Sequence, residues 1–349
     1  MMIFIAIASI LFLVILHELG HFFVARKFGV KVEEFGIGLP PRLFGKKFGE
    51  TLYSLNLLPL GAFVRMTGEE ERSDDPRSFS KQSLFARMLI VAGGVLVFWL
   101  VAAIIFAGVG ATSGIQTALD DSAVQANAKV QILGIAKGSP AEIAGLQAGD
   151  TILNFTRIGE FQESADSFKG REMSVKIQRG NESFDATLIP RENPPSGEGP
   201  LGVMLARTAS ITYPWYEAPF QGVSIAWNMT LEVVQGLWHT ASSLFQRQGL
   251  PDGVQLTGPV GIVFLLKNTL SLGISSFLFF LGVLSVYLAV FNVLPIPAAD
   301  GGRLLFLALE AVRKKPLSQA LEQKIIGVSF GVLILLLLYV TVRDVSNLF

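Results

Sequence analysis

The chain has 349 residues with 28 basic and 28 acidic side chains, so its net charge is zero and nothing in the charge balance favours binding to nucleic acid. Hydrophobic residues make up 51% and charged residues only 16%, which excludes an ordinary soluble domain and indicates an integral membrane protein. There is no cysteine, which excludes a disulfide framework and a thiolate metal site.

Four apolar runs are long enough to cross a bilayer, which takes about 20 residues. They are residues 3–24, 86–109, 276–296 and 325–342. The first run lacks a basic amino-terminal region and a small-residue cleavage site, so we expect a retained span and not a signal peptide. The sequence therefore predicts a polytopic α-helical membrane protein with four transmembrane helices.

The density of Lys and Arg predicts the orientation of these spans. Segment 25–87 holds 11 of them in 63 residues, and the short connection 303–324 is also basic, whereas segment 111–275 spreads 11 over 165 residues. The two denser segments should face the cytoplasm. Both termini and segment 111–275 should then lie on the extracytoplasmic side.

The first span contains HELGH at residues 17–21, with two of the three histidines of the protein. Residues four apart lie on the same face of a helix, so His17 and His21 can point at one metal ion. This H-E-x-x-H pattern suits zinc, with Glu18 as the base that activates water and shuttles its proton. The alternative is a pair of helix-end histidines at the membrane interface that bind no metal.

Residues 35–66 alternate β-forming residues with Gly and Pro and do not read as a helix. LPLG at 58–61 predicts a hairpin turn between two short strands. We expect a membrane-associated β-hairpin element on the cytoplasmic side of the first span. Non-helical backbone at that depth needs protein or a water-filled cavity to cover it.

Residues 128–205 predict a small soluble domain of strands with a short helix, because β-forming runs alternate with turn sequences such as GLQAGD and RGN. Residues 206–270 follow as an amphipathic helix and a connector. An apolar stripe runs along this helix from Val223 to Phe245 and includes Trp227 and Trp238. The stripe either packs on the soluble domain or the spans, or it lies on the outer membrane surface.

A catalytic zinc ion usually takes three protein ligands, so a third ligand must come from elsewhere in the chain. The candidate is Asp300, the only acidic residue between Asp252 and Glu310. Pro295 and Pro297 break the helix just before it, and an unwound segment there can bring Asp300 to the histidines. The alternative is an Asp that caps a helix at the interface.

HELGH at 17–21, together with NVLPIP at 292–297 and Asp300-Gly301, resembles the site-2 protease family of intramembrane zinc metalloproteases, in the bacterial regulator-of-sigma-E protease branch. The resemblance implies that Zn²⁺ is held by His17, His21 and Asp300. It also implies that Glu18 is the catalytic base and that Asn292 helps to hold the substrate strand near the metal. An edge strand of segment 35–66 would then pair with the unwound substrate.

The soluble domain resembles a PDZ domain through GSPAEIAGLQAGDTIL at 138–153. The strand with Leu201, Gly202 and Val203 comes last, whereas ordinary PDZ domains have it early, which implies a circular permutation. These three residues would receive the carboxyl terminus of a peptide through backbone N–H groups. The alternative is a domain that only filters substrates by steric exclusion.

The expected organisation has four parts. They are 1–110 with two spans, the zinc motif and the β-element; 128–205 as an extracytoplasmic PDZ domain; 206–270 as amphipathic helix and connector; and 271–349 with the last two spans and the zinc-ligand segment. The chain departs from the family pattern at Ala299, where Leu is frequent, and at Gly94 and Val97, where Pro and Asn are usual. It also shows one PDZ domain where well-studied members have two.

The resemblance implies hydrolysis of peptide bonds inside the transmembrane segment of a single-span protein that another protease has already trimmed. An anti-sigma factor or a remnant signal peptide would be such a substrate. The location would be the inner (plasma) membrane of a bacterial cell. Competing hypotheses are a non-catalytic PDZ membrane scaffold and, in last place, a transporter with an intramembrane ion site, which should show paired internal repeats.

Overall fold

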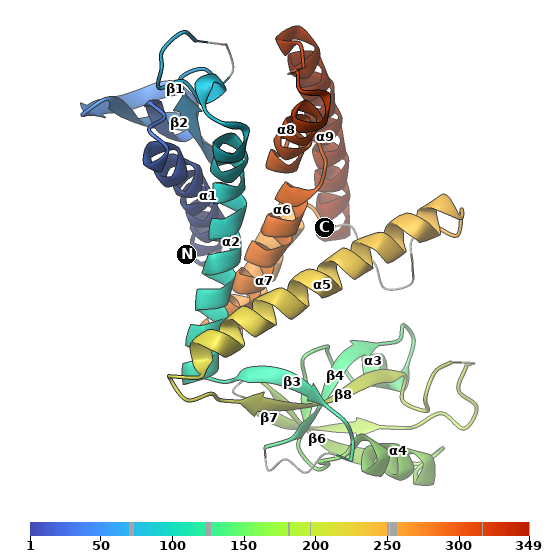
Figure 1. Ribbon diagram of the computed structural model, residues 1–349. Helices are drawn as coiled ribbons and strands as arrows, with labels where there is room; N and C mark the ends of the chain where they lie inside the picture. Colours follow the sequence, from blue (N-terminus) through green and yellow to red (C-terminus); the bar gives the residue numbers. More distant parts are fainter. Residues whose placement is uncertain are drawn as a thin grey trace. The chain divides into compact units, whose positions relative to one another are not determined.

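The computed structural model describes residues 1–69, 73–122, 127–180, 182–195, 197–249, 251, 257–315 and 317–348. The chain divides into two compact units. One combines Met1–Gly108 with Glu217–Phe349, and the other is Val109–Tyr216. The first unit is mainly helical and the second is built around a β-sheet (Figure 1).

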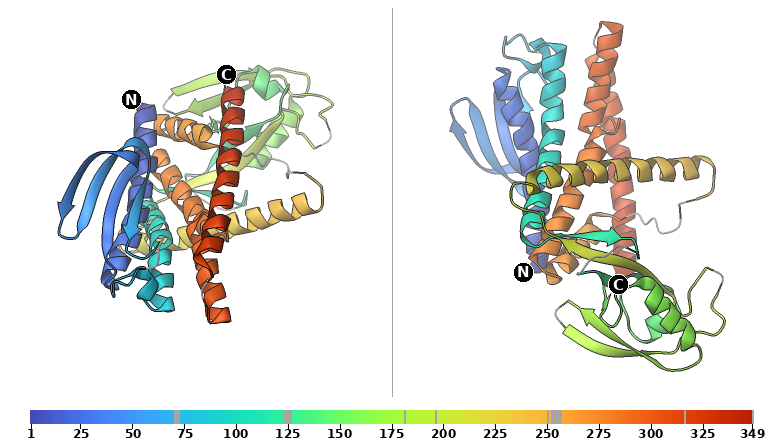
Figure 2. Two further views of the ribbon diagram at one scale, coloured as in Figure 1. Left: turned by 90° about the horizontal axis from the view of Figure 1, so that it is seen from above. Right: turned by 60° about the horizontal axis from the view of Figure 1, so that its bottom comes forward.

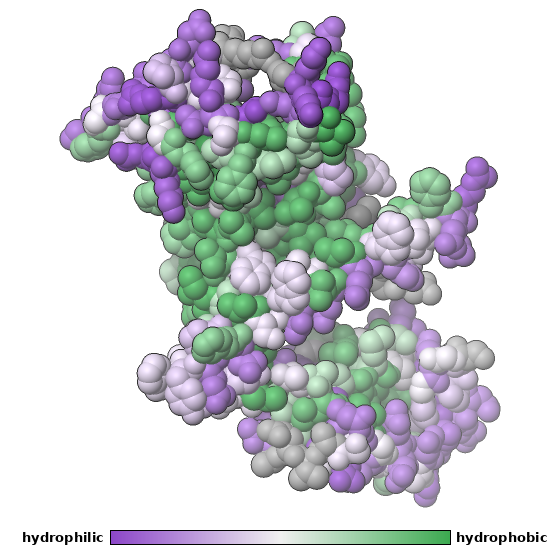
Figure 3. Space-filling view, in the orientation of Figure 1, coloured by the Kyte–Doolittle hydropathy of each residue, from purple (hydrophilic) through white to green (hydrophobic). Residues whose placement is uncertain are grey.

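Among the described residues of the chain, four helices are long and apolar enough to cross a membrane. They are α1 (Met2–Lys27), α2 (Leu84–Thr112), α7 (Ile274–Val293) and α9 (Gln319–Leu348). They overlap the four predicted runs, although α7 ends three residues before the predicted end at 296, so a polytopic helical membrane protein is confirmed. Hydrophobic side chains cover the middle of the helical unit, and hydrophilic ones gather at the end that carries the strands β1 (Val32–Phe48) and β2 (Thr51–Met66) (Figure 3).

Two of the spans touch at glycine. A Cβ at Gly20 of α1 would lie 2.4 Å from the carbonyl oxygen of Gly93 in α2, and a Cβ at Gly93 would lie 2.9 Å from the Gly20 oxygen. Small residues allow helix backbones in a membrane to approach this closely. The contact brings α2 directly against the face of α1 that carries the two histidines.

A short apolar helix, α6 (Pro259–Ser271), completes the core of the helical unit. At 13 residues it is about 20 Å long, too short to cross a bilayer. Leu266 is fully buried in a cluster with Leu13 of α1, Phe98 of α2 and Leu281 of α7. Only a connector was expected here, because an apolar run of this length resembles neither a span nor a surface helix.

Helix α5 (Ala218–Phe245) crosses the spans at a steep angle (Figures 1 and 2). It packs on them through small residues: a Cβ at Gly222 would lie 2.3 Å from the Ala103 carbonyl oxygen, and Ala226 is fully buried. The predicted apolar stripe lies on the exposed side, with Trp227 56% and Trp238 77% exposed. The helix therefore packs on the spans with the face opposite to the stripe.

The strands β1 (Val32–Phe48) and β2 (Thr51–Met66) form a two-stranded sheet, which we call the β-element. Both strands bend, so residues 34–37 pair with 52–55 on one side and with 62–65 on the other. The turn between the strands is at residues 49–50, so the predicted hairpin turn at 58–61 is wrong. Residues 58–61 lie inside β2, where the strand changes its pairing partner and Gly61 has a φ of +84°.

The second unit contains a six-stranded sheet with the order β3-β8-β4-β5-β6-β7. Its strands are β3 (Ile115–Leu119), β4 (Lys129–Ile135), β5 (Thr151–Ile152), β6 (Met173–Arg179), β7 (Glu182–Leu188) and β8 (Val203–Ile211). The helices α3 (Pro140–Ile143) and α4 (Ile158–Ser167) accompany it. Its fully buried side chains include Val130, Val175 and Ile177. The last strand, β8, is inserted between the first two.

The GLQAGD turn of the second unit is held by a buried carboxylate. Asp150 is 1% exposed and accepts two hydrogen bonds of 2.7 Å from the Arg179 guanidinium on β6. It also accepts one of 2.8 Å from the Gln147 backbone N–H. Through these three hydrogen bonds, Asp150 fixes the turn against the sheet.

Candidate metal centre

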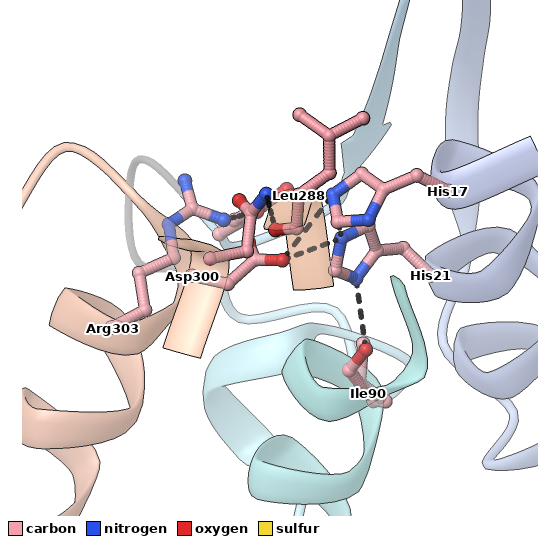
Figure 4. A network of polar contacts seen from close by, with 8 residues as sticks. His17, His21, Ile90, Leu288, Asp300 and Arg303 are labelled. Atoms are coloured by element: carbon pink, nitrogen blue, oxygen red, sulfur yellow. Dashed lines mark hydrogen bonds and ion pairs between the residues drawn. The ribbon is translucent and has the colours of Figure 1, made fainter. Parts of the chain in front are cut away.

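His17 and His21 lie one turn apart on α1 and point in the same direction (Figure 4). Both are buried, with 7% and 8% of their surface exposed. Their Nε2 atoms are 3.2 Å apart. Two imidazole nitrogens from one helix face therefore converge on a single point.

Asp300 reaches this point because the chain is irregular between α7 and α8 (Asp300–Arg313). Helix α7 ends at Val293, two prolines follow, and α8 starts at Asp300 with Ala299 as its N-cap, so Asp300 is not the capping residue. Gly301 packs tightly on the end of α7: a Cβ there would lie 2.1 Å from the Leu294 carbonyl oxygen. The start of α8 is thereby pressed against the preceding turn.

The three side chains have the spacing that a tetrahedral metal site requires. Asp300 Oδ2 lies 3.3 Å from His17 Nε2 and 3.2 Å from His21 Nε2. Ligands about 2.0 Å from a zinc ion at tetrahedral angles are about 3.3 Å from one another. Asp300 Oδ2 is buried and accepts no regular hydrogen bond from any described residue. The donor set, two imidazoles and one carboxylate, therefore fits Zn²⁺ and leaves one tetrahedral position open.

Groups on α2 orient both imidazoles. The Nδ1–H of His21 donates a hydrogen bond of 2.9 Å to the Ile90 carbonyl oxygen, because that oxygen can only accept. This tautomer leaves Nε2 free for a metal. The ring of His17 stacks on Phe98, with centroids 4.5 Å apart and planes 18° from parallel.

Gly94 of α2 forms the wall behind both imidazoles. A Cβ at this position would lie 2.3 Å from His21 Nε2 and 2.5 Å from His17 Cε1. No side chain can occupy this space without displacing the rings. Gly94, Ile90 and Phe98 were not predicted as site residues, since the only available signal was the Gly-Gly pair in the second span.

Glu18 lines a cavity of about 420 Å³ with His21 and Asp300, which we call the metal-site cavity. Residues 63–66, the last part of β2, line the same cavity. A carboxylate next to the ligand set and a strand edge therefore share one space. The cavity also provides the cover that non-helical backbone at this depth needs.

The other predicted site residues do not join the ligand triangle, although Leu288, which Asn292 contacts, lies beside it (Figure 4). The Asn292 side chain donates a hydrogen bond of 2.9 Å to the Leu288 carbonyl oxygen of its own helix, and it is not among the described residues that line the metal-site cavity. Leu201, Gly202 and Val203 belong to the second unit. The Gly202 N–H already donates to the Gly199 carbonyl oxygen at 3.0 Å, which leaves it engaged within its own loop.

A helical unit with four candidate spans, an H-E-x-x-H motif and a converging carboxylate has the features of a membrane-embedded zinc metalloprotease. The sequence profile of Peptidase family M50 matches residues 5–338. The chain therefore belongs to this family, which includes the site-2 proteases, and it is a zinc metalloprotease.

Relatives that match this chain nearly from end to end support this assignment. A candidate zinc metalloprotease of Clostridium perfringens is 33% identical over 340 residues, 95% of each chain. Zinc metalloprotease RasP of Shouchella clausii is 29% identical over 99% of this chain and 98% of its own. Regulator of sigma-W protease RasP of Bacillus subtilis is 26% identical over 97% of this chain and 96% of its own.

Proposed function

We propose that His17, His21 and Asp300 hold the zinc ion and that Glu18 is the catalytic base of an intramembrane protease. The observation that carries this proposal is the triangle of ligand atoms, with sides of 3.2–3.3 Å, next to a cavity that Glu18 lines. When bound, zinc would polarise the scissile carbonyl and lower the pKa of the attacking water.

Residues of the chain supply proton transfer and the positioning of the ligands. Glu18 accepts a proton from the attacking water and passes it to the leaving amine, which is the role of the Glu in the H-E-x-x-H motif. The Ile90 carbonyl and the Phe98 ring keep the imidazoles in place. Burial of the site limits water to the molecules that the cavity admits.

The substrate would be a transmembrane helix that unwinds locally before cleavage. A helix protects its carbonyl groups in hydrogen bonds to residues four positions on, so an extended segment must form first. In the described pairing, residues 62–65 of β2 have a strand partner on one side only, and 63–66 line the metal-site cavity. This supports addition of the substrate as a further strand at that edge. Weakly helical spans would open more readily and so be preferred.

We propose a single-span protein, already trimmed by another protease, as the substrate, in the inner (plasma) membrane of a bacterial cell. Among the relatives, the name of the Bacillus subtilis protein, regulator of sigma-W protease, favours an anti-sigma factor as one substrate; a remnant signal peptide is the other. The distribution of Lys and Arg supports both termini and the second unit on the extracytoplasmic side.

The second unit would act as a permuted PDZ domain that excludes untrimmed ectodomains. Its support is the strand order, in which β8 at the end of the domain lies beside β4 at its start. The Gly202 N–H is engaged within its own loop, which favours the steric filter over capture of a peptide carboxyl terminus by residues 201–203.

Metal content tests the centre of this proposal. Elemental analysis of detergent-purified protein should find about one zinc ion per chain, and His21→Ala and Asp300→Ala should each lose it. Glu18→Gln should keep the zinc but lose cleavage of a span-containing reporter. Wild-type protein without zinc, or Asp300→Ala with undiminished zinc, would contradict the proposed site and favour the non-catalytic scaffold.

A further inference from the structure

The carboxylate of Glu69 joins two elements of the helical unit. Glu69 follows β2 by three residues, and its Oε2 accepts a hydrogen bond of 3.3 Å from the Met66 backbone N–H. Its Oε1 pairs with the Nη1 of Arg303, which lies on α8 one turn after Asp300. One side chain therefore connects the end of the cavity-lining strand with the start of the helix that carries Asp300.

This pair lies at the boundary of two cavities. Glu69 and Arg303 line the metal-site cavity with Glu18, and they also line a second cavity of about 430 Å³ formed between α2, α8 and α9. The Glu69 side chain is only 9% exposed. The Arg303 side chain is 40% exposed, so solvent reaches the guanidinium end of the pair while the carboxylate end is shielded.

A second ion pair on the same helix provides a natural comparison. Glu310 lies two turns after Arg303 and accepts two hydrogen bonds, of 2.6 and 3.0 Å, from Arg87 of α2. Both of these residues line the second cavity, and neither is among the described residues of the metal-site cavity. Both ion pairs hold α8, but of the two only Glu69–Arg303 lines the metal-site cavity.

We propose that Glu69 and Arg303 are positioning residues that keep the edge of β2 and Asp300 in a fixed relation. A substrate strand bound to residues 63–66 then presents its scissile carbonyl to the metal centre at the correct distance. Misplacement by about 1 Å is enough to lower a rate by two orders of magnitude. This inference rests on the proposed function, since it assumes that β2 receives the substrate.

The test compares kcat, KM and zinc content in Glu69→Gln, Arg303→Gln and the double variant, with a span-containing reporter as substrate. Each single variant should lower kcat about tenfold or more, with KM within about threefold and zinc near one per chain. The double variant should be no slower than the slower single variant, because both changes break the same contact. Arg303→Lys, which keeps the charge, should have a kcat between those of Arg303→Gln and the wild type.

The control is the double variant Arg87→Gln/Glu310→Gln. It should lower the thermal stability of the protein but leave kcat within about threefold of wild type. The positioning role is overturned if the Glu69 and Arg303 variants keep wild-type kcat, if their losses add, or if the control loses kcat equally. Wild-type protein that neither holds zinc nor cleaves overturns the proposed function itself, and the role of the pair with it.

Discussion

At the scale of single residues, the missing side chain of Gly94 shapes the wall behind the two imidazoles. A Cβ at this position would lie 2.3 Å from His21 Nε2, inside the space that the imidazole occupies. Gly94→Ala should therefore push the rings apart and weaken zinc affinity at least about tenfold. Competition with a chelator of known affinity measures this directly.

Gly108 of the same helix is the matched control for Gly94. A Cβ there would have no neighbouring atom within 4 Å, so Gly108→Ala adds the same methyl group without a clash and favours the helix. Its zinc affinity should equal that of wild type. Equal affinities in both variants would show that the imidazoles can move aside, contrary to the prediction.

The sequence predicted the converging side chains of the site but not their surroundings. Ligand chemistry restricts the residue type, so two histidines four residues apart and one isolated Asp stand out in an apolar chain. The wall residues Gly94 and Phe98 are ordinary in any transmembrane helix, and their role depends on how α2 packs on α1. That packing depends on tertiary contacts, which the local sequence pattern of α2 does not predict.

At the scale of elements, the start of α4 depends on a charged carboxylate from the loop after β3. Hydrogen bonds from the Gly159 and Ile158 N–H groups, of 3.0 and 2.7 Å, lower the pKa of Asp121 below its ordinary value. Since the folded pKa is the lower one, the stabilisation is complete above the ordinary pKa of about 3.9. It is lost as the pH falls through the folded value.

Hydrogen exchange of the Ile158 and Gly159 amides checks this pH dependence. Between pH 6 and about pH 2, their protection should fall relative to that of β6, after correction for intrinsic rates. Asp121→Asn keeps a carbonyl acceptor but cannot titrate, so its protection should change little over the same range. An identical response in this variant would assign the effect to another group.

Elements were predictable where one pattern dominated. The four spans follow from hydropathy alone, since a bilayer accepts few alternatives. Helix α6 was not predicted because its 13 residues are too few for a membrane span and too apolar for a surface helix. The turn at residues 58–61 was misplaced because β2 bends there and pairs with the other side of residues 34–37. The apolar stripe of α5 was identified, but whether it faces protein or lipid depends on the small residues opposite to it.

At the scale of the whole molecule, the predicted orientation can be tested with single cysteines, because the chain has none of its own. In intact spheroplasts, a membrane-impermeant maleimide should label Ser183→Cys in the second unit. It should label Lys47→Cys of the β-element only after the membrane is permeabilised. The reverse pattern would place the metal-site end of the spans outside and invert the proposed topology.

The exposure of α9 gives the lipid a direct part in the site. Only 6% of its most apolar window is buried, against 44% for α2, so most of the surface of this span is left for lipid. Its apolar run, residues 325–342, is about 27 Å long, which is close to the hydrocarbon core of about 30 Å. Because Ile326 of α9 lines the metal-site cavity, a displacement of this weakly packed span would move one wall of that cavity. A change in the lipid around α9 would thus alter the geometry of the metal site.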